Sequence, residues 1–278
     1  MLGRPLLGGL LQGACSRDAS FLGMRLLLVL VLWAVACASP AAPATAGEVP
    51  ATVEPTWEDA AAAAAAVVAV DAGSDAIDEE RADVDPKINR RFLDPKLDVD
   101  RWKKNFEGES REVFAARGEV LAALGLSPGQ AFADIGAGTG FYLWSFADAV
   151  GTEGRAYGVE ISPRFLELLR KESEARVLDQ VSIIEGSETS VQLPPDSVDL
   201  VFTCDTYHHF EYPKSTLASI HRALRPGGSF VVVDFHRIPG KTKKWILEHV
   251  RAGRDVVRKE IEAAGFVFAE EVHIKGFK

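Results

Sequence analysis

The sequence predicts an α/β domain built on a doubly wound, mainly parallel sheet. Short apolar segments alternate along the chain with segments whose apolar residues recur at helical spacing, a pattern typical of parallel sheets covered by helices. Residues 229–234 (SFVVVD) are apolar throughout their middle, as expected for a strand buried on both faces. A glycine-rich turn, 136–140 (GAGTG), directly follows the first apolar segment, where such sheets bind ligands.

The predicted elements begin near residue 88. A helix with Val113, Val120 and Leu124 on its apolar side should end at Gly125, because glycine readily adopts the conformation that terminates helices. Strands are then predicted at 131–135 (AFADI), 155–160 (RAYGVE), 181–185 (VSIIE), 198–204 (VDLVFTC), 229–234 and, last, near 266–274. The intervening helices are predicted at 141–150, at 163–171, around Leu217, Ile220 and Leu224, and at 254–264.

Residues 1–37 have the features of an export signal. Met24 and Arg25 precede the apolar run 26–36 (LLLVLVLWAVA), which is too short for a membrane-spanning helix of about 20 residues. The run leads into Cys37 in a segment that resembles a bacterial lipobox, where the cysteine is lipidated and becomes the new N-terminus. The sequence therefore favours a lipid-anchored protein of the bacterial cell envelope. Export to the periplasm without an anchor and a cytoplasmic location are the alternatives.

Residues 38–87 are expected to form a disordered linker between this segment and a domain at 88–278. The linker contains a pure alanine run at 60–66 and is rich in acidic residues over 71–85. Such a composition lacks the large apolar side chains that offset the entropy lost when a chain is ordered.

The charge, the cysteine content and the spacing of possible ligands argue against two classes of site. The net charge of −9 argues against general binding of nucleic acid, which requires clustered lysine and arginine. Cys15, Cys37 and Cys204 form no Cys-x-x-Cys pair, and no group of carboxylates or histidines has a convincing metal-binding spacing. No metal site is therefore expected.

The turn after the first strand has the properties of a cofactor site. Its glycines permit positive φ and a close approach of the backbone to a ligand, and the following helix offers unpaired N–H groups. The spacing is G-x-G-x-G, which differs from the G-x-G-x-x-G of dinucleotide-binding proteins. Asp134 precedes the glycines, and Glu160 ends the next strand, where a carboxylate can accept hydrogen bonds from both hydroxyls of a ribose.

The segment from Asp134 to Gly140 resembles motif I of class I S-adenosylmethionine-dependent methyltransferases. Three further segments resemble motifs of that family and occur in the expected order: 158–162 (GVEIS), 196–209 (DSVDLVFTCDTYHH) and 224–228 (LRPGG). The resemblance covers about residues 100–278 and implies a Rossmann-like fold, with S-adenosylmethionine as cofactor. That fold usually ends in an antiparallel strand. Only four residues follow 266–274, so either this last strand is missing or the strand boundaries are shifted.

The same resemblance implies roles for single residues. Those matched to the cofactor are Asp134, Gly136, Gly138, Gly140, Glu160, Ser187, Glu188 and Asp205. The turn would hold the methionine portion, and Glu160 would hold the ribose. Ser187 and Glu188 stand where the family often has an acid near the adenine amino group, and Asp205 would lie close to the sulfonium.

Candidates for residues that face the reacting methyl group follow the fourth and fifth strands: Asp205, His208, His209 and His236. Because the cofactor is already activated, a general base is needed only when the acceptor must lose a proton. The alternative for His208 and His209 is a structural role in fixing their loop.

These inferences together predict an enzyme that methylates a small-molecule acceptor. The alternative from another class is a catalytically inactive methyltransferase-fold binding protein in the cell envelope. Nucleotide-linked oxidoreduction is disfavoured by the glycine spacing, and transfer of a different group, such as aminopropyl, is compatible with the same fold.

Overall fold

The computed structural model describes residues 33–34, 87–108, 111–275 and 277. Residues 38–86 of the predicted linker, and all of the predicted export signal except Trp33 and Ala34, lie outside the described residues. Within the described part of the chain, no helix is both long and apolar enough to cross a membrane.

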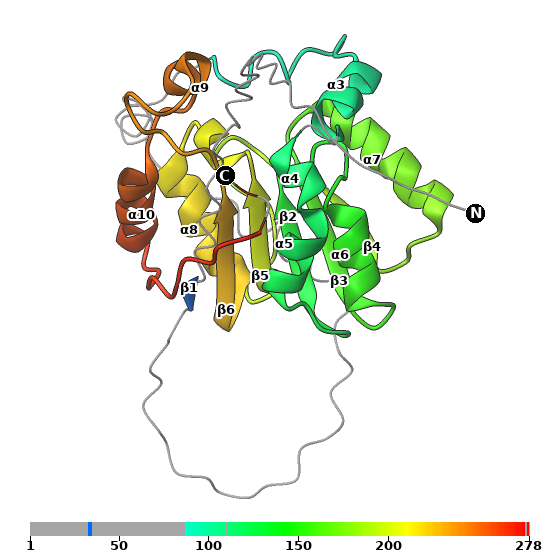
Figure 1. The fold of residues 1–278 in the computed structure, drawn as a ribbon. Coiled ribbons are helices and arrows are strands. Elements are labelled where there is room, and N and C mark those ends of the chain that lie inside the picture. Colours follow the sequence, from blue (N-terminus) through cyan, green and yellow to red (C-terminus); the bar gives the residue numbers. More distant parts are fainter. Residues whose placement is uncertain (1–32, 35–86, 109–110, 276, 278) are drawn as a thin grey trace, which may run out of the picture.

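Five parallel strands form the centre of the domain (Figure 1). They are β2 (Ala131–Ile135), β3 (Arg155–Glu160), β4 (Val181–Glu185), β5 (Val198–Cys204) and β6 (Leu224–Val233). Their order in the sheet is β4-β3-β2-β5-β6, so the winding reverses between β2 and β5. The predicted doubly wound parallel sheet is thereby confirmed.

A short strand, β1 (Trp33–Ala34), extends the sheet beyond β6. It pairs antiparallel with β6, with Trp33 opposite Phe230 and Ala34 opposite Ser229. The outer edge of β6 is therefore partly occupied by a segment that lies far away in the sequence.

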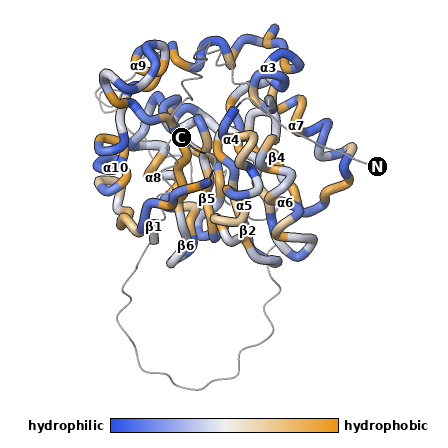
Figure 2. The backbone as a smooth tube through the Cα atoms, in the orientation of Figure 1, coloured by the Kyte–Doolittle hydropathy of each residue, from blue (hydrophilic) through white to orange (hydrophobic). Residues whose placement is uncertain are grey.

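Helices cover both faces of the sheet. They are α3 (Val99–Phe106), α4 (Glu112–Ala115), α5 (Arg117–Leu124), α6 (Leu143–Val150), α7 (Pro163–Arg176), the 3-10 helix η2 (Tyr207–His209), α8 (Pro213–Ala223), α9 (Lys244–His249) and α10 (Arg254–Ala263). On one face Phe132 and Val231 belong to a core shared with α5 and α6, and on the other Ala133 and Val232 belong to a core shared with α8 and α10. Figure 2 shows apolar residues concentrated along the central strands, whereas α3 is mostly hydrophilic.

Most predicted boundaries agree with the structure, and the deviations are local. The first predicted helix ends at Gly125 with φ of 60°, as expected, but it is divided at Ala116 into α4 and α5. The strand predicted at 229–234 begins earlier, because residues 224–228 also lie within β6, where the pairing with β5 is irregular between Val198 and Leu200.

The strand predicted near 266–274 is wrong, because this segment forms no regular strand. Its apolar residues pack as single side chains instead. Phe266 lies against Phe230 at a ring-centroid distance of 5.6 Å, and Ile274 is buried in the core beside α5 and α6. The edge of β6 that a further strand would need is paired with β1 over Ser229 and Phe230.

Candidate functional site

The candidate site lies at the carboxyl ends of the central strands, next to the point where the winding reverses. The turn after β2, the end of β3 and the loop after β5 line one cavity, here named the first pocket. Asp134 is the penultimate residue of β2, Glu160 ends β3, and Asp205 directly follows β5. Parallel strands bring their carboxyl ends to one edge, so these three carboxyl groups, far apart in sequence, line the same pocket.

The glycine-rich turn can follow its path only without side chains at two positions. Gly136 has φ of 73°, and a Cβ atom there would lie 2.3 Å from Cγ2 of Thr206. Gly140 has φ of 79°, and a Cβ atom there would lie 2.5 Å from the indole of Trp144. The glycines therefore let the loop after β5 and the helix α6 pack directly against the turn.

Glu160 is buried and accepts three backbone hydrogen bonds. Its Oε1 accepts from the N–H groups of Ile161 at 2.8 Å and Ser162 at 2.9 Å, and its Oε2 accepts from Gly138 N–H at 2.8 Å. Burial raises the pKa of Glu160, and the three N–H groups oppose that rise by stabilising the carboxylate. These bonds fix the side chain at the pocket wall, occupy both acceptor sites of Oε1 and leave one acceptor site on Oε2.

Asp134 is a fully buried carboxyl group that lies near a second carboxylate, Glu160. Burial, and next the negative charge of Glu160, raise its pKa to about 8. Its carboxyl group is therefore largely protonated at neutral pH in the ligand-free protein. A cationic group placed beside it would restore the ionised form.

Asp205 forms a close ion pair with Arg111 at the rim of the first pocket. Burial raises the pKa of Asp205 to about 6, although the guanidinium of Arg111 lowers it. Among the described residues, neither Oδ1 of Asp205 nor Oγ1 of Thr139 has a hydrogen-bond partner, and both atoms are buried. Both residues line the first pocket, so the pocket contains polar atoms that a ligand can satisfy.

The central part of the chain is similar to a known protein family. Residues 133–232 match the family model described as a methyltransferase domain. These residues therefore belong to a methyltransferase domain. The buried unpaired oxygens, the glycine-rich turn and the fixed carboxylate of Glu160 suit a cofactor with ammonium and ribose groups.

Individual relatives agree with this assignment. A demethylmenaquinone methyltransferase of Geobacillus stearothermophilus is 26% identical over 182 residues, which are 55% of this chain and 78% of the relative. A ubiquinone/menaquinone biosynthesis C-methyltransferase of Marinomonas sp. is 26% identical over 119 residues, 42% of this chain and 47% of the relative. The structure of an S-adenosylmethionine-dependent methyltransferase from Aquifex aeolicus superposes with a TM-score of 0.57 at 24% identity, over 64% of this chain and 94% of that one.

The two residues predicted near the adenine also line the first pocket of the methyltransferase domain. Ser187 and Glu188 follow β4 and are both exposed. Ser187 belongs to a tight turn in which its N–H donates to Ser190 O at 2.8 Å. Their assignment to the adenine remains a prediction.

The four candidates for the reacting end do not converge on one pocket. Asp205 and His209 line the first pocket, whereas His208 and His236 line a second pocket beside the end of β6. His208 is held there by Asp234, whose carboxylate accepts from its backbone N–H at 3.1 Å and lies 2.7 Å from its Nδ1. Burial lowers the pKa of His208, but the carboxylate of Asp234 outweighs burial, and the net shift is upward.

His209 has the opposite electrostatic environment. Burial, followed by the nearby imidazoles of His208 and His249, lowers the pKa of His209 to about 2. Its Nδ1 lies 3.0 Å from Oδ1 of Asn89. His209 is therefore a neutral imidazole in the pocket wall. Burial also lowers the pKa of the half-buried His236.

The segment that covers the pocket, residues 87–106 with α3, was not predicted from the sequence. Asn89, Phe92 and Phe106 of this segment line the first pocket, as does Arg111 just beyond it. The signal that could have found it is local: Asp98 caps α3 by accepting from Arg101 N–H at 3.0 Å, and aromatic residues then follow at helical spacing. The carboxylate partner of Arg111 lies 94 residues away, so the sequence contains no local sign of that pair.

Proposed function

We propose that the methyltransferase domain methylates a small, largely apolar acceptor that binds in the first pocket beside the cofactor. The observation that carries this proposal is the composition of the pocket wall, which joins buried polar atoms to many aromatic rings. The aromatic lining residues are Phe92, Phe106, Phe141, Tyr142, Phe165 and Phe210. Rings of this kind bind flat apolar molecules through their faces and edges.

The acceptor class that we propose is a ring compound of the quinone type. Two relatives of this chain carry names that refer to demethylmenaquinone and to ubiquinone/menaquinone biosynthesis. The aromatic wall of the first pocket supports the same class, since its rings offer an extended apolar surface.

We assign the cofactor-holding roles residue by residue. Glu160 would accept hydrogen bonds from the ribose hydroxyls, and Asp134 would face the methionine portion from the end of β2. Asp205, whose Oδ1 lacks a partner among the described residues, would lie near the sulfonium. Bound S-adenosylmethionine supplies an activated methyl group, so the domain itself has to align the acceptor and exclude water.

Arg111 would act by positioning Asp205. The guanidinium contacts the Asp205 carboxylate and also donates to Phe106 O at 2.9 Å. It therefore connects the covering segment at α3 to the loop after β5 across the pocket. The aromatic rings of the covering segment would shield the reacting groups from water.

Calorimetric titration with S-adenosylmethionine and S-adenosylhomocysteine tests the cofactor site. We expect micromolar binding that weakens at least tenfold in Glu160→Ala. The matched control is Glu185→Ala, because Glu185 ends the neighbouring strand in register with Glu160 but is exposed. A folded protein that binds neither compound would overturn the cofactor assignment.

A transfer assay tests the acceptor. Methyl-labelled S-adenosylmethionine is incubated with the protein and a series of reduced naphthoquinones, benzoquinones and simple phenols. Label should enter a ring compound, and Phe106→Ala should raise KM for the acceptor more than KM for the cofactor. Transfer only to hydrophilic acceptors would refute the proposed acceptor class.

We propose separately that residues 1–37 export the chain and that Cys37 anchors it to a bacterial membrane. The support is the apolar run at 26–36 followed by a lipobox-like cysteine. Cys37→Ser should move the protein from the membrane fraction to the soluble fraction. An unchanged distribution would argue against lipidation.

A further inference from the structure

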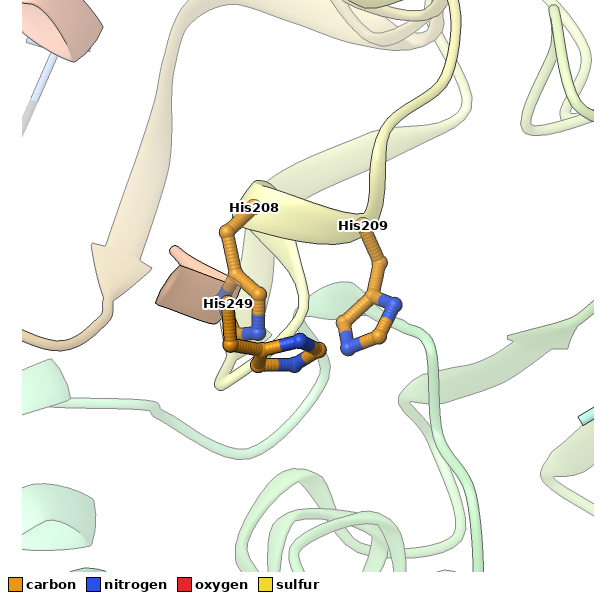
Figure 3. Close-up of side chains that lie close together, drawn as sticks. All are labelled: His208, His209 and His249. Carbon is orange, nitrogen blue, oxygen red and sulfur yellow. The ribbon is translucent and has the colours of Figure 1, made fainter. Parts of the chain in front are cut away.

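Three histidines that are separate in the sequence come together beside the first pocket (Figure 3). His208 and His209 belong to η2, and His249 is the last residue of α9. One potential ligand nitrogen from each ring lies within 4.8 Å of the other two. Their ring centroids are 4.4 to 5.1 Å apart. This grouping depends on the packing of α9, which sequence analysis did not predict.

Hydrogen bonds orient two of these rings as they are oriented in metal sites. Nδ1 of His208 lies 2.7 Å from the carboxylate of Asp234, and Nδ1 of His209 lies 3.0 Å from the amide oxygen of Asn89. Because both partner atoms accept, each Nδ1 carries a proton, and in the neutral imidazole each Nε2 has a free lone pair. Carboxylate or carbonyl partners on the far nitrogen are typical of histidines that bind metals.

The partner Asn89 is itself fixed in position. Its side-chain nitrogen donates to His209 O at 2.9 Å and to Oε1 of Glu211 at 3.2 Å. The amide oxygen must therefore be the atom that faces Nδ1 of His209. The orientation of the His209 ring thus follows from a chain of buried contacts.

The charges around the cluster are compatible with a cation. The carboxylate of Glu260 balances the positive charge of Arg251, because the Arg251 guanidinium donates two hydrogen bonds of 2.7 Å to it. Asp234 is itself the carboxylate partner of the His208 ring, and the carboxylate of Glu211 lies behind Asn89, the partner of His209. The outer hollow that His249 lines contains four cations and two carboxylates: Lys87, Arg90, Arg91, Arg251, Asp94 and Glu248. The charge that favours a cation therefore comes from the side of the cluster with Asp234 and Glu211.

We propose that His208, His209 and His249 form a binding site for a divalent transition-metal ion of the zinc type. Zinc binds imidazole nitrogens at about 2.0–2.1 Å, and three histidines with a fourth, open position are a common donor set. Nitrogens around such an ion are about 3.4 Å apart. Small side-chain rotations that draw the three rings together would therefore complete the site.

The three histidines of the cluster line different hollows, so a bound ion would connect separate parts of the domain. His209 lines the first pocket, His208 the second pocket, and His249 the outer hollow. A bound ion would link α9 to the loop after β5 and so stiffen one wall of the methyltransferase pocket. This inference is independent of the proposed acceptor, because it concerns metal binding alone.

Cobalt titration of the full chain tests the site, since Co²⁺ replaces Zn²⁺ and reports four-coordinate geometry by its visible absorption. We expect one Co²⁺ per chain, displaced by one equivalent of Zn²⁺, and a melting temperature that EDTA lowers. His249→Ala should weaken Co²⁺ binding at least tenfold. The matched control is His273→Ala, which removes an exposed histidine outside the cluster and should bind as the wild type does.

Further measurements distinguish a loss of metal ligands from a loss of folding in His249→Ala. Circular dichroism and S-adenosylhomocysteine binding report whether His249→Ala is folded, and His249→Asp, which keeps a possible ligand at this position, should bind Co²⁺ more tightly than His249→Ala. The proposal is overturned if the wild type binds no Co²⁺ or Zn²⁺ stoichiometrically. It is equally overturned if folded His249→Ala binds Co²⁺ as the wild type does.

Discussion

Single residues of the site combine burial with incomplete pairing. Asp134 is buried beside another carboxylate, and Asp205 retains a buried oxygen without a partner among the described residues. Such arrangements are unfavourable for the ligand-free fold and are compensated when a ligand of suitable charge binds. The burial and incomplete pairing of the carboxyl groups at the strand ends therefore indicate where a ligand binds.

The raised pKa of Asp134 predicts a pH dependence of stability. Its pKa is about 8 in the folded, ligand-free protein and about 3.8 in an unfolded chain. Between these values the folded state holds a proton that the unfolded state has lost, so the contribution of Asp134 to the free energy of unfolding falls as pH rises from about 4 to about 8. Urea unfolding of the wild type and Asp134→Asn at several pH values should show that their difference changes over this range. A constant difference would mean that Asp134 does not titrate with a raised pKa.

Gly136 provides a second prediction at this scale. Gly136→Ala would place Cβ 2.3 Å from the Thr206 side chain at a φ of 73°, so contact strain adds to backbone strain. Gly129→Ala is the control, because Gly129 has φ of 86° but open space around the added atom. Left-handed strain alone costs about 1–2 kcal/mol, and Gly136→Ala should lose more than the control in urea unfolding. Equal losses would show that the turn and Thr206 separate at little cost.

The helices and strands differ in how far the local sequence predicts them. The five parallel strands and α6, α7, α8 and α10 follow from apolar periodicity, since all of them except the half-buried β4 place buried apolar side chains in a core. The elements α3, α9 and η2 were not predicted, because they are short and bury few residues of their own. These short elements nevertheless contribute Phe106 and all three clustered histidines to the surroundings of the site.

Removal of β1 is a prediction at the scale of elements. Cleavage before Cys37 would delete β1 and expose the edge of β6 at Ser229 and Phe230. Only two residues pair there, and cross-strand pairs contribute about 0.2–1 kcal/mol each. Residues 37–278 should therefore lose no more than about 2 kcal/mol of unfolding free energy relative to the full chain, with unchanged affinity for S-adenosylhomocysteine. A large loss of affinity would show that β1 supports the pocket.

The whole domain is a three-layer sandwich whose two cores meet at the sheet, with the cofactor pocket at one edge. Binding there contacts the turn after β2, the end of β3 and the loop after β5 at once. A ligand of this pocket should therefore stabilise the whole domain rather than one segment.

This coupling gives a prediction for the intact protein. S-adenosylhomocysteine at 100 times its Kd should raise the free energy of unfolding by about 2.7 kcal/mol, provided that the unfolded chain does not bind it. Thermal unfolding at several ligand concentrations measures the effect, and Glu160→Ala should need correspondingly more ligand. A melting temperature that stays constant in the presence of saturating ligand would contradict the placement of the site within the folding unit.

The sequence by itself determined the parallel sheet, the glycine-rich turn and the residues Asp134 and Glu160 at its strand ends, because apolar periodicity and turn chemistry act over a few neighbouring residues. It could not determine that Arg111 pairs with Asp205 or that His208 and His236 face a different pocket from His209. Only the tertiary structure decided these contacts, and with them the edge pairing of β6 and the meeting of His249 with η2. They join segments many residues apart, and their geometry arises when helices and loops pack on the finished sheet.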